Sequence, residues 1–167
     1  MAFRRQPWKF RVRRGLKYLV LAVLLPAWPS GPSRAGGSDV VVADRYTGLA
    51  IAGYDPVAYF VDARPIQGRA DFEFRLEQGV FRFRNEGNRA AFAEHPEVYL
   101  PQFGGHDPIA LARGVALAGN PLEWQIVDDR LYLFYSGQAR ATFVANPQEA
   151  IAVAAERWPE VVRGLIP

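Results

Sequence analysis

The stretch Gly53-Tyr54-Asp55-Pro56-Val57-Ala58 decides the fold, because it returns 52 residues later as Gly105-His106-Asp107-Pro108-Ile109-Ala110. The residues after each copy agree in the same order, at aromatic positions, at an Arg-Ala-x-Phe motif and at a proline. The matched positions are Phe72 with Trp124, Phe74 with Ile126, Phe81 with Tyr132, Phe83 with Phe134, Arg89-Ala90-Ala91-Phe92 with Arg140-Ala141-Thr142-Phe143, and Pro96 with Pro147. Ordered agreement of this kind predicts an internal duplication, with one unit over about residues 48–101 and a second over about residues 102–160.

Each unit predicts a short helix, a β-hairpin and a second helix. Asp followed by Pro is typical of a helix start, because aspartate caps free backbone N–H groups and proline suits the first helical position. In the first unit, residues 71–75 and 80–84 alternate between apolar and charged side chains, which indicates a hairpin with one buried face. In the second unit, the strand at 130–135 is apolar on both faces, so we expect it to be covered on both. Asn85 or Asn88 is expected to cap the next helix in the first unit, and Ser136 in the second.

Together these patterns predict an α+β fold. A hairpin and one helix bury too little apolar surface to be stable alone, so the two tandem pseudo-repeats are expected to pack into one compact domain. This domain is predicted to span about residues 44–163, after a flexible tether over residues 36–43. A last amphipathic helix is predicted over about residues 147–158.

The first 35 residues are predicted to be an export signal. They hold eight of the 20 Lys and Arg residues and none of the 17 acidic residues. A basic stretch ends at Lys17, the apolar run 18–25 follows, and small residues lead to a cleavage site after Ala35. The run is shorter than the roughly 20 apolar residues of a transmembrane helix, so we expect no membrane span in the mature chain. We expect a periplasmic or secreted protein that uses the Sec route or, through Arg13-Arg14, the twin-arginine route; an uncleaved amphipathic anchor is the alternative.

Charge and residue types exclude several functions. From residue 36 onward the chain has 12 basic and 17 acidic residues, and a nucleic-acid binder would concentrate positive charge on its folded part, so a nucleic-acid partner is excluded. The absence of cysteine excludes disulfides, thiolate metal sites and a catalytic cysteine. Beyond the leader the hydroxyl nucleophiles are only Ser38, Thr47, Ser136 and Thr142, and none lies in a pattern that supplies a histidine and an acid. The sequence therefore favours a protein that is not an enzyme.

The order of the motifs resembles the YHS domain family, over residues 48–160 and most closely its exported members. The residues that carry the resemblance are Gly53 to Phe60, Phe83 to Phe92, Tyr99 to Gly105, Asn120-Pro121 with Trp124, Leu131-Tyr132-Leu133, and Trp158-Pro159. The resemblance implies that metal-associated members carry cysteines where this chain has Ala58, Arg84 and Asn88 in the first unit, and Ala110, Tyr135 and Ala139 in the second. Many exported members also carry a cysteine where this chain has Asp107. The resemblance thus implies the family fold, here without any of its thiolates.

A small-ligand site is one interpretation of the duplicated motif. If the duplication gives an approximate twofold axis, the two Asp-Pro helix starts could flank one cleft, where helix N-termini attract anions. The residues predicted to bind are Tyr54, Asp55, Tyr59, His106, Asp107 and Arg113. In the alternative interpretation, which we favour, the aromatic residues at duplicated positions pack in the core between the units.

A metal site is the alternative function. His106 and Asp107 could bind zinc or copper with help from His95 or Glu94. The other interpretation is structural, since Asp107 is placed to cap a helix and His95 precedes Pro96 at a helix end, where histidine satisfies terminal carbonyls. The spacing of the two histidines matches no established ligand motif. We therefore expect no cofactor, and a non-catalytic module in the periplasm that binds a small molecule or another protein.

Overall fold

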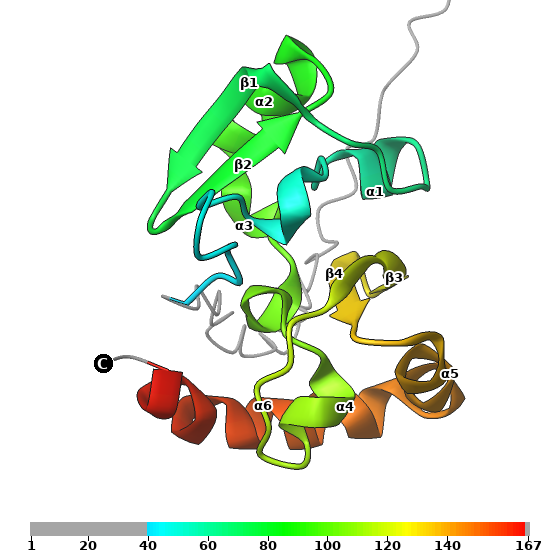
Figure 1. Ribbon diagram of the computed structural model, residues 1–167. Helices are drawn as coiled ribbons and strands as arrows, with labels where there is room; N and C mark the ends of the chain where they lie inside the picture. Colours follow the sequence, from blue (N-terminus) through cyan, green and yellow to red (C-terminus); the bar gives the residue numbers. More distant parts are fainter. Residues whose placement is uncertain (1–39, 166–167) are drawn as a thin grey trace, which may run out of the picture. The chain divides into compact units, whose positions relative to one another are not determined.

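The computed structural model describes residues 40–165, and it confirms the α+β class (Figure 1). The elements are η1 (Ile51–Gly53), α1 (Ala58–Val61), β1 (Arg69–Leu76), β2 (Gly79–Phe83), α2 (Glu86–Glu94), α3 (Pro96–Tyr99), η2 (Gln102–Gly105), α4 (Pro108–Leu111), β3 (Asn120–Val127), β4 (Arg130–Phe134), α5 (Gly137–Ala145) and α6 (Pro147–Leu165), where η denotes a 3-10 helix. The same series of 3-10 helix, short helix, hairpin and two helices therefore occurs twice. That this order arose by duplication stays a prediction.

The two hairpins share their irregularities. Each forms its own antiparallel two-stranded sheet, β1 with β2 and β3 with β4. The pairing shifts once in each, between Arg69 and Glu73 in the first hairpin and between Asn120 and Trp124 in the second. Asp128 and Asp129 form the second turn, both with positive φ angles of 50° and 56°. This is the geometry of the tight turns that match the twist of paired strands, and aspartate tolerates it.

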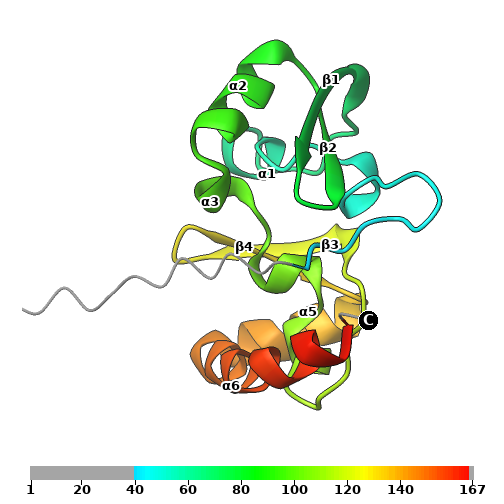
Figure 2. The same ribbon diagram turned by 90° about the vertical axis from the view of Figure 1, so that its left-hand side faces the viewer.

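Strand β4 is covered on both faces, as its sequence predicts. Leu131 and Leu133 belong to one buried cluster, together with aromatic residues from β2 and α2. Tyr132 and Phe134 point the other way and pack with Phe143 of α5 in a second cluster. The first cluster therefore takes residues from both units, and Figure 2 shows the β3–β4 hairpin between β1, β2 and α1–α3 on one side and α5 and α6 on the other.

Predicted caps begin α2 and α5, the helices that come directly after the two hairpins. The Asn85 side chain accepts a hydrogen bond from the Asn88 backbone N–H at the start of α2. Ser136 accepts one from the Ala139 N–H at the start of α5. Of the two asparagines considered from the sequence, Asn85 is therefore the cap, and Asn88 is free to bond elsewhere.

Two predicted boundaries, that of the tether and that of the last helix, are corrected. Residues 41–43 are no tether, because the Val42 N–H donates to the Gly104 carbonyl at 2.8 Å, Ala43 pairs with Ala50, and Val41 packs against the first core cluster. Helix α6 continues past the predicted end at residue 158, through Pro159 to Leu165. A proline removes one backbone hydrogen-bond donor, but a helix can continue through it where tertiary packing stabilises the helix. Here α4 packs against α6.

The predicted export signal over residues 1–35 lies outside the described residues. Within residues 40–165, no helix has both the length and the apolar character needed to cross a membrane.

Candidate functional site

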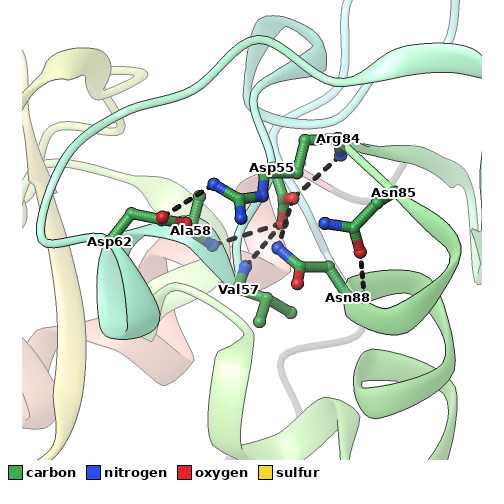
Figure 3. A network of polar contacts seen from close by, with 7 residues as sticks. All are labelled: Asp55, Val57, Ala58, Asp62, Arg84, Asn85 and Asn88. Carbon is green, nitrogen blue, oxygen red and sulfur yellow. Dashed lines mark hydrogen bonds and ion pairs between the residues drawn. The ribbon is translucent and has the colours of Figure 1, made fainter.

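The carboxylate of Asp55 is the centre of a buried polar cluster in the first unit (Figure 3). Its Oδ1 accepts hydrogen bonds from the backbone N–H groups of Val57 and Ala58, at 2.9 and 3.3 Å. Its Oδ2 accepts from the Arg84 backbone N–H at 2.9 Å and from the Asn88 side-chain amide at 2.7 Å. One carboxylate thus joins the start of α1, the end of β2 and the first turn of α2.

An ion pair extends this cluster toward the surface. The Arg84 guanidinium contacts Asp62 Oδ1 at 2.7 Å, and the two side chains are 37% and 20% exposed. The second oxygen, Asp62 Oδ2, is buried and has no hydrogen-bond partner among the described residues. Asp62, Arg84 and Asn88 are absent from the sequence-predicted site, because they lie far apart along the chain from the partners they meet. The family resemblance points to the positions of Arg84 and Asn88, and Asn88 is otherwise predicted only as a possible helix cap.

Asp107 repeats the role of Asp55 in the second unit. Its Oδ1 accepts from the backbone N–H groups of Ile109 and Ala110, at 2.7 and 3.3 Å, and its Oδ2 accepts from the Tyr135 N–H at 2.9 Å. Pro108 takes the first position of α4, so the predicted Asp-Pro helix start is confirmed in the second unit. In the first unit it is wrong by two residues, because α1 begins at Ala58 with Val57 as its N-cap residue. Asp107 has one donor fewer than Asp55, because Ala139 stands where the first unit has Asn88.

The positions that the family resemblance singles out meet in space. Ala58, Arg84 and Asn88 all donate hydrogen bonds to the Asp55 carboxylate. The chain matches no protein-family model, no curated protein and no solved structure. Membership of the YHS family therefore stays a prediction.

The two tyrosines of the predicted ligand site take part in packing. Tyr59 is buried in the first core cluster, and its hydroxyl donates to the Pro121 carbonyl at 3.0 Å. Its ring meets Trp124 edge-on at 5.3 Å, and burial raises the pKa of its phenol. Tyr54 is half-buried against the same cluster. This arrangement agrees with the packing interpretation of the duplicated aromatic residues.

His106 is also committed to the fold. It is 7% exposed, and its ring Nδ1 lies 2.9 Å from the Phe103 carbonyl oxygen, which makes Nδ1 the protonated nitrogen. The ring packs against Trp158 of α6 with 5.4 Å between ring centroids. Burial lowers the pKa of the imidazole, and the bond to Phe103 opposes this only in part.

The alternative metal site gains no support from the geometry. His95 is a surface residue whose ring nitrogens lie 3.8 Å from Glu94 and 3.4 Å from Glu97. In the part of the chain that the structure describes, no three His, Asp or Glu side chains come together as a group that could hold a metal ion. The structure thus does not bring His95 to His106 and Asp107.

Arg113 is the predicted binding residue that lines a pocket. This pocket has a volume of about 580 Å³ and lies between the loop after α4 and the C-terminal half of α6. None of the other five predicted ligand-binding residues lines it. A second pocket of about 390 Å³ is lined by the 42–45 segment, η1 and the residues around Gly105 and Gly119, and the six predicted residues take no part in it. The expected cleft shared by Tyr54, Tyr59, His106 and Arg113 is formed by neither pocket.

The buried imidazole makes stability depend on pH. Because the pKa of His106 is lowered in the folded protein, the unfolded chain binds a proton at a higher pH than the folded one. The free energy of unfolding is therefore expected to fall as the pH drops below the ordinary histidine pKa of 6.5. Urea unfolding at several pH values between about 7.5 and 5 measures this step. The step should vanish in His106→Gln and persist in His95→Gln, and an unchanged step in His106→Gln would contradict the assignment.

Proposed function

We propose that this protein is an exported, non-catalytic module that binds a small molecule, built on a YHS-like fold that carries no thiolates. The observation that carries the proposal is the pocket of about 580 Å³ beside α6, lined by Arg113. Proteins hold small organic molecules in pockets of roughly 300–1,000 Å³. The Asp55 cluster is the larger of the two buried carboxylate clusters described above, but its carboxylate already accepts four hydrogen bonds.

The Asp55 cluster supports the YHS-like part of the proposal. The resemblance implies thiolates at the positions of Ala58, Arg84 and Asn88, and here the backbone N–H groups of Ala58 and Arg84 and the side-chain amide of Asn88 donate to one carboxylate, that of Asp55. At that point this chain has hydrogen bonds to Asp55, with the Arg84–Asp62 ion pair beside them. We infer that a region suited to ligands in relatives serves here to hold α1, β2 and α2 together.

The cellular location is proposed from the sequence alone. A basic stretch, a short apolar run and a small-residue cleavage site are typical of an export signal. Binding would then take place in the periplasm or outside the cell.

Elemental analysis of the mature protein, purified untagged and without chelator from its native compartment, tests the metal-free part of the proposal. We expect no stoichiometric transition metal, because His106 and Asp107 are bonded to backbone groups of their own unit. Stoichiometric zinc or copper that is lost in His106→Ala, but retained in the surface variant Glu156→Ala, would overturn it in favour of a metal-binding protein.

A further inference from the structure

We propose that the pocket beside α6 binds a small organic monocarboxylate with an apolar body. This inference rests on the proposed function and names its ligand class. The carboxylate would lie between Arg113 and Arg157, and the apolar body would cover Ala116, Val161 and Leu165.

Backbone hydrogen bonds within one tight turn fix the backbone of Arg113. The Arg113 N–H donates to the Ala110 carbonyl, and the next two N–H groups return to α4 at Leu111 and Ala110. Gly114 makes this tight return possible with a φ of +76°, which side chains rarely adopt. Arg113 therefore projects from a fixed turn, and α4, which carries this turn, packs against α6 (Figure 1).

Charge selects a monoanion for this pocket. Arg113 and Arg157 both line it, and neither forms an ion pair with any residue in the range 40–165. Guanidinium groups bind carboxylates through charge-assisted, often paired hydrogen bonds. Glu160 is the acidic residue of the lining, so the three charged side chains sum to one positive charge. A dianion such as phosphate would meet about twice the repulsion from Glu160 that a monocarboxylate meets at the same distance.

The apolar residues that line the pocket would contact the apolar part of the ligand. Ala116, Val161 and Leu165 contribute apolar surface, and Leu165 is 38% exposed. A hydrocarbon or aromatic group placed against them removes apolar surface from water, which contributes about 25 cal/mol per Å². Two guanidinium groups that form no ion pair within residues 40–165, together with an apolar wall, are suited to an amphipathic acid.

Calorimetric titration of the purified protein with octanoate tests the inference. We expect saturable one-to-one binding that weakens about tenfold or more in the double variant Arg113→Ala/Arg157→Ala, because charge-assisted bonds are lost. The matched control is Arg64→Ala/Arg75→Ala, which removes the same charge from two exposed arginines outside the pocket and should bind as wild type. Octanol, which lacks the carboxylate, should bind more weakly than octanoate. Glu160→Gln should bind octanoate more tightly.

Two results would overturn the inference: octanoate binding that is equal in the wild type and the pocket double variant, and no octanoate binding at all. In the second case, a different small molecule that co-purifies with the wild type and is lost from the pocket double variant would leave the proposed function standing and refute only the ligand class. Absence of both octanoate binding and a co-purifying molecule would refute both proposals.

Discussion

Replacing Asp55 with alanine is expected to lower the free energy of unfolding by about 3–5 kcal/mol. The substitution leaves the N–H groups of Val57, Ala58 and Arg84 and the amide of Asn88 without their acceptor. Val57 and Ala58 are buried, so water replaces the lost acceptor poorly. A buried donor left without a partner costs about 1–3 kcal/mol. Urea unfolding followed by circular dichroism measures the loss.

Asp44 supplies the matched control for Asp55. Its Oδ1 accepts three hydrogen bonds, against four for the Asp55 carboxylate, from the backbone N–H groups of Tyr46 and Thr47 and from the Thr47 hydroxyl, but all of these groups are exposed. Because water can take the place of the carboxylate there, Asp44→Ala should cost about 1 kcal/mol or less. Asp107→Ala should resemble Asp55→Ala. A loss for Asp55→Ala no larger than that for Asp44→Ala would contradict the structural role of the cluster.

Replacing Gly119 with alanine is the second substitution expected to have a large effect. A Cβ at this position would lie 2.5 Å from Leu133 Cβ and 2.9 Å from both the Gly105 carbonyl oxygen and the Leu133 backbone carbon. Backbone atoms cannot turn aside as a flexible side chain can, so strands β3 and β4 would have to separate. We expect a loss of about 3 kcal/mol or more in the free energy of unfolding, or failure to fold.

Substitutions at Gly68 and Gly48 serve as the parallel variant and the control for Gly119→Ala. Gly68 has the corresponding place in the first hairpin, where a Cβ would lie 2.4 Å from the backbone carbon of Arg82, so Gly68→Ala should be as damaging. Gly48 has a φ of +70° and nothing within 4 Å of its Cβ position, so Gly48→Ala should cost only the backbone strain, about 1–2 kcal/mol. Equal losses at Gly119 and Gly48 would show that close packing at Gly119 does not matter. Thermal and urea unfolding of the three variants compares them directly.

Local patterns predicted much of the fold. Period-two alternation identified the first hairpin, the repeat of its aromatic positions identified the second, and Asp-Pro identified the start of α4. The two apolar faces of residues 130–135 predicted a strand with a core on each side, which the structure confirms. These features are determined by residues that are close together in the sequence, so the sequence pattern predicts them. The end of α6 could not be predicted, because α6 continues through Pro159 while packed against α4, which is distant in sequence.

The candidate site was harder to predict because its contacts are long-range. The Arg84–Asp62 pair spans 22 residues and the Asn88–Asp55 bond spans 33, and no periodic pattern links such positions. Tyrosine at position 59 is compatible with a pocket or with a core, and the decision depends on where Pro121 and Trp124 lie. Arg113 was predicted to bind in a cleft that neither pocket forms, and it lines a different pocket, which Arg157 joins only through the packing of α4 on α6.

Native mass spectrometry of the untagged protein, isolated from its own compartment, tests small-molecule binding most directly. We predict a non-covalent organic adduct on the wild type and on Arg64→Ala/Arg75→Ala, and its loss from Arg113→Ala/Arg157→Ala, since both pocket arginines would hold the ligand. Bare protein in every preparation, or an adduct that survives in the pocket double variant, would contradict the assignment of function to this pocket.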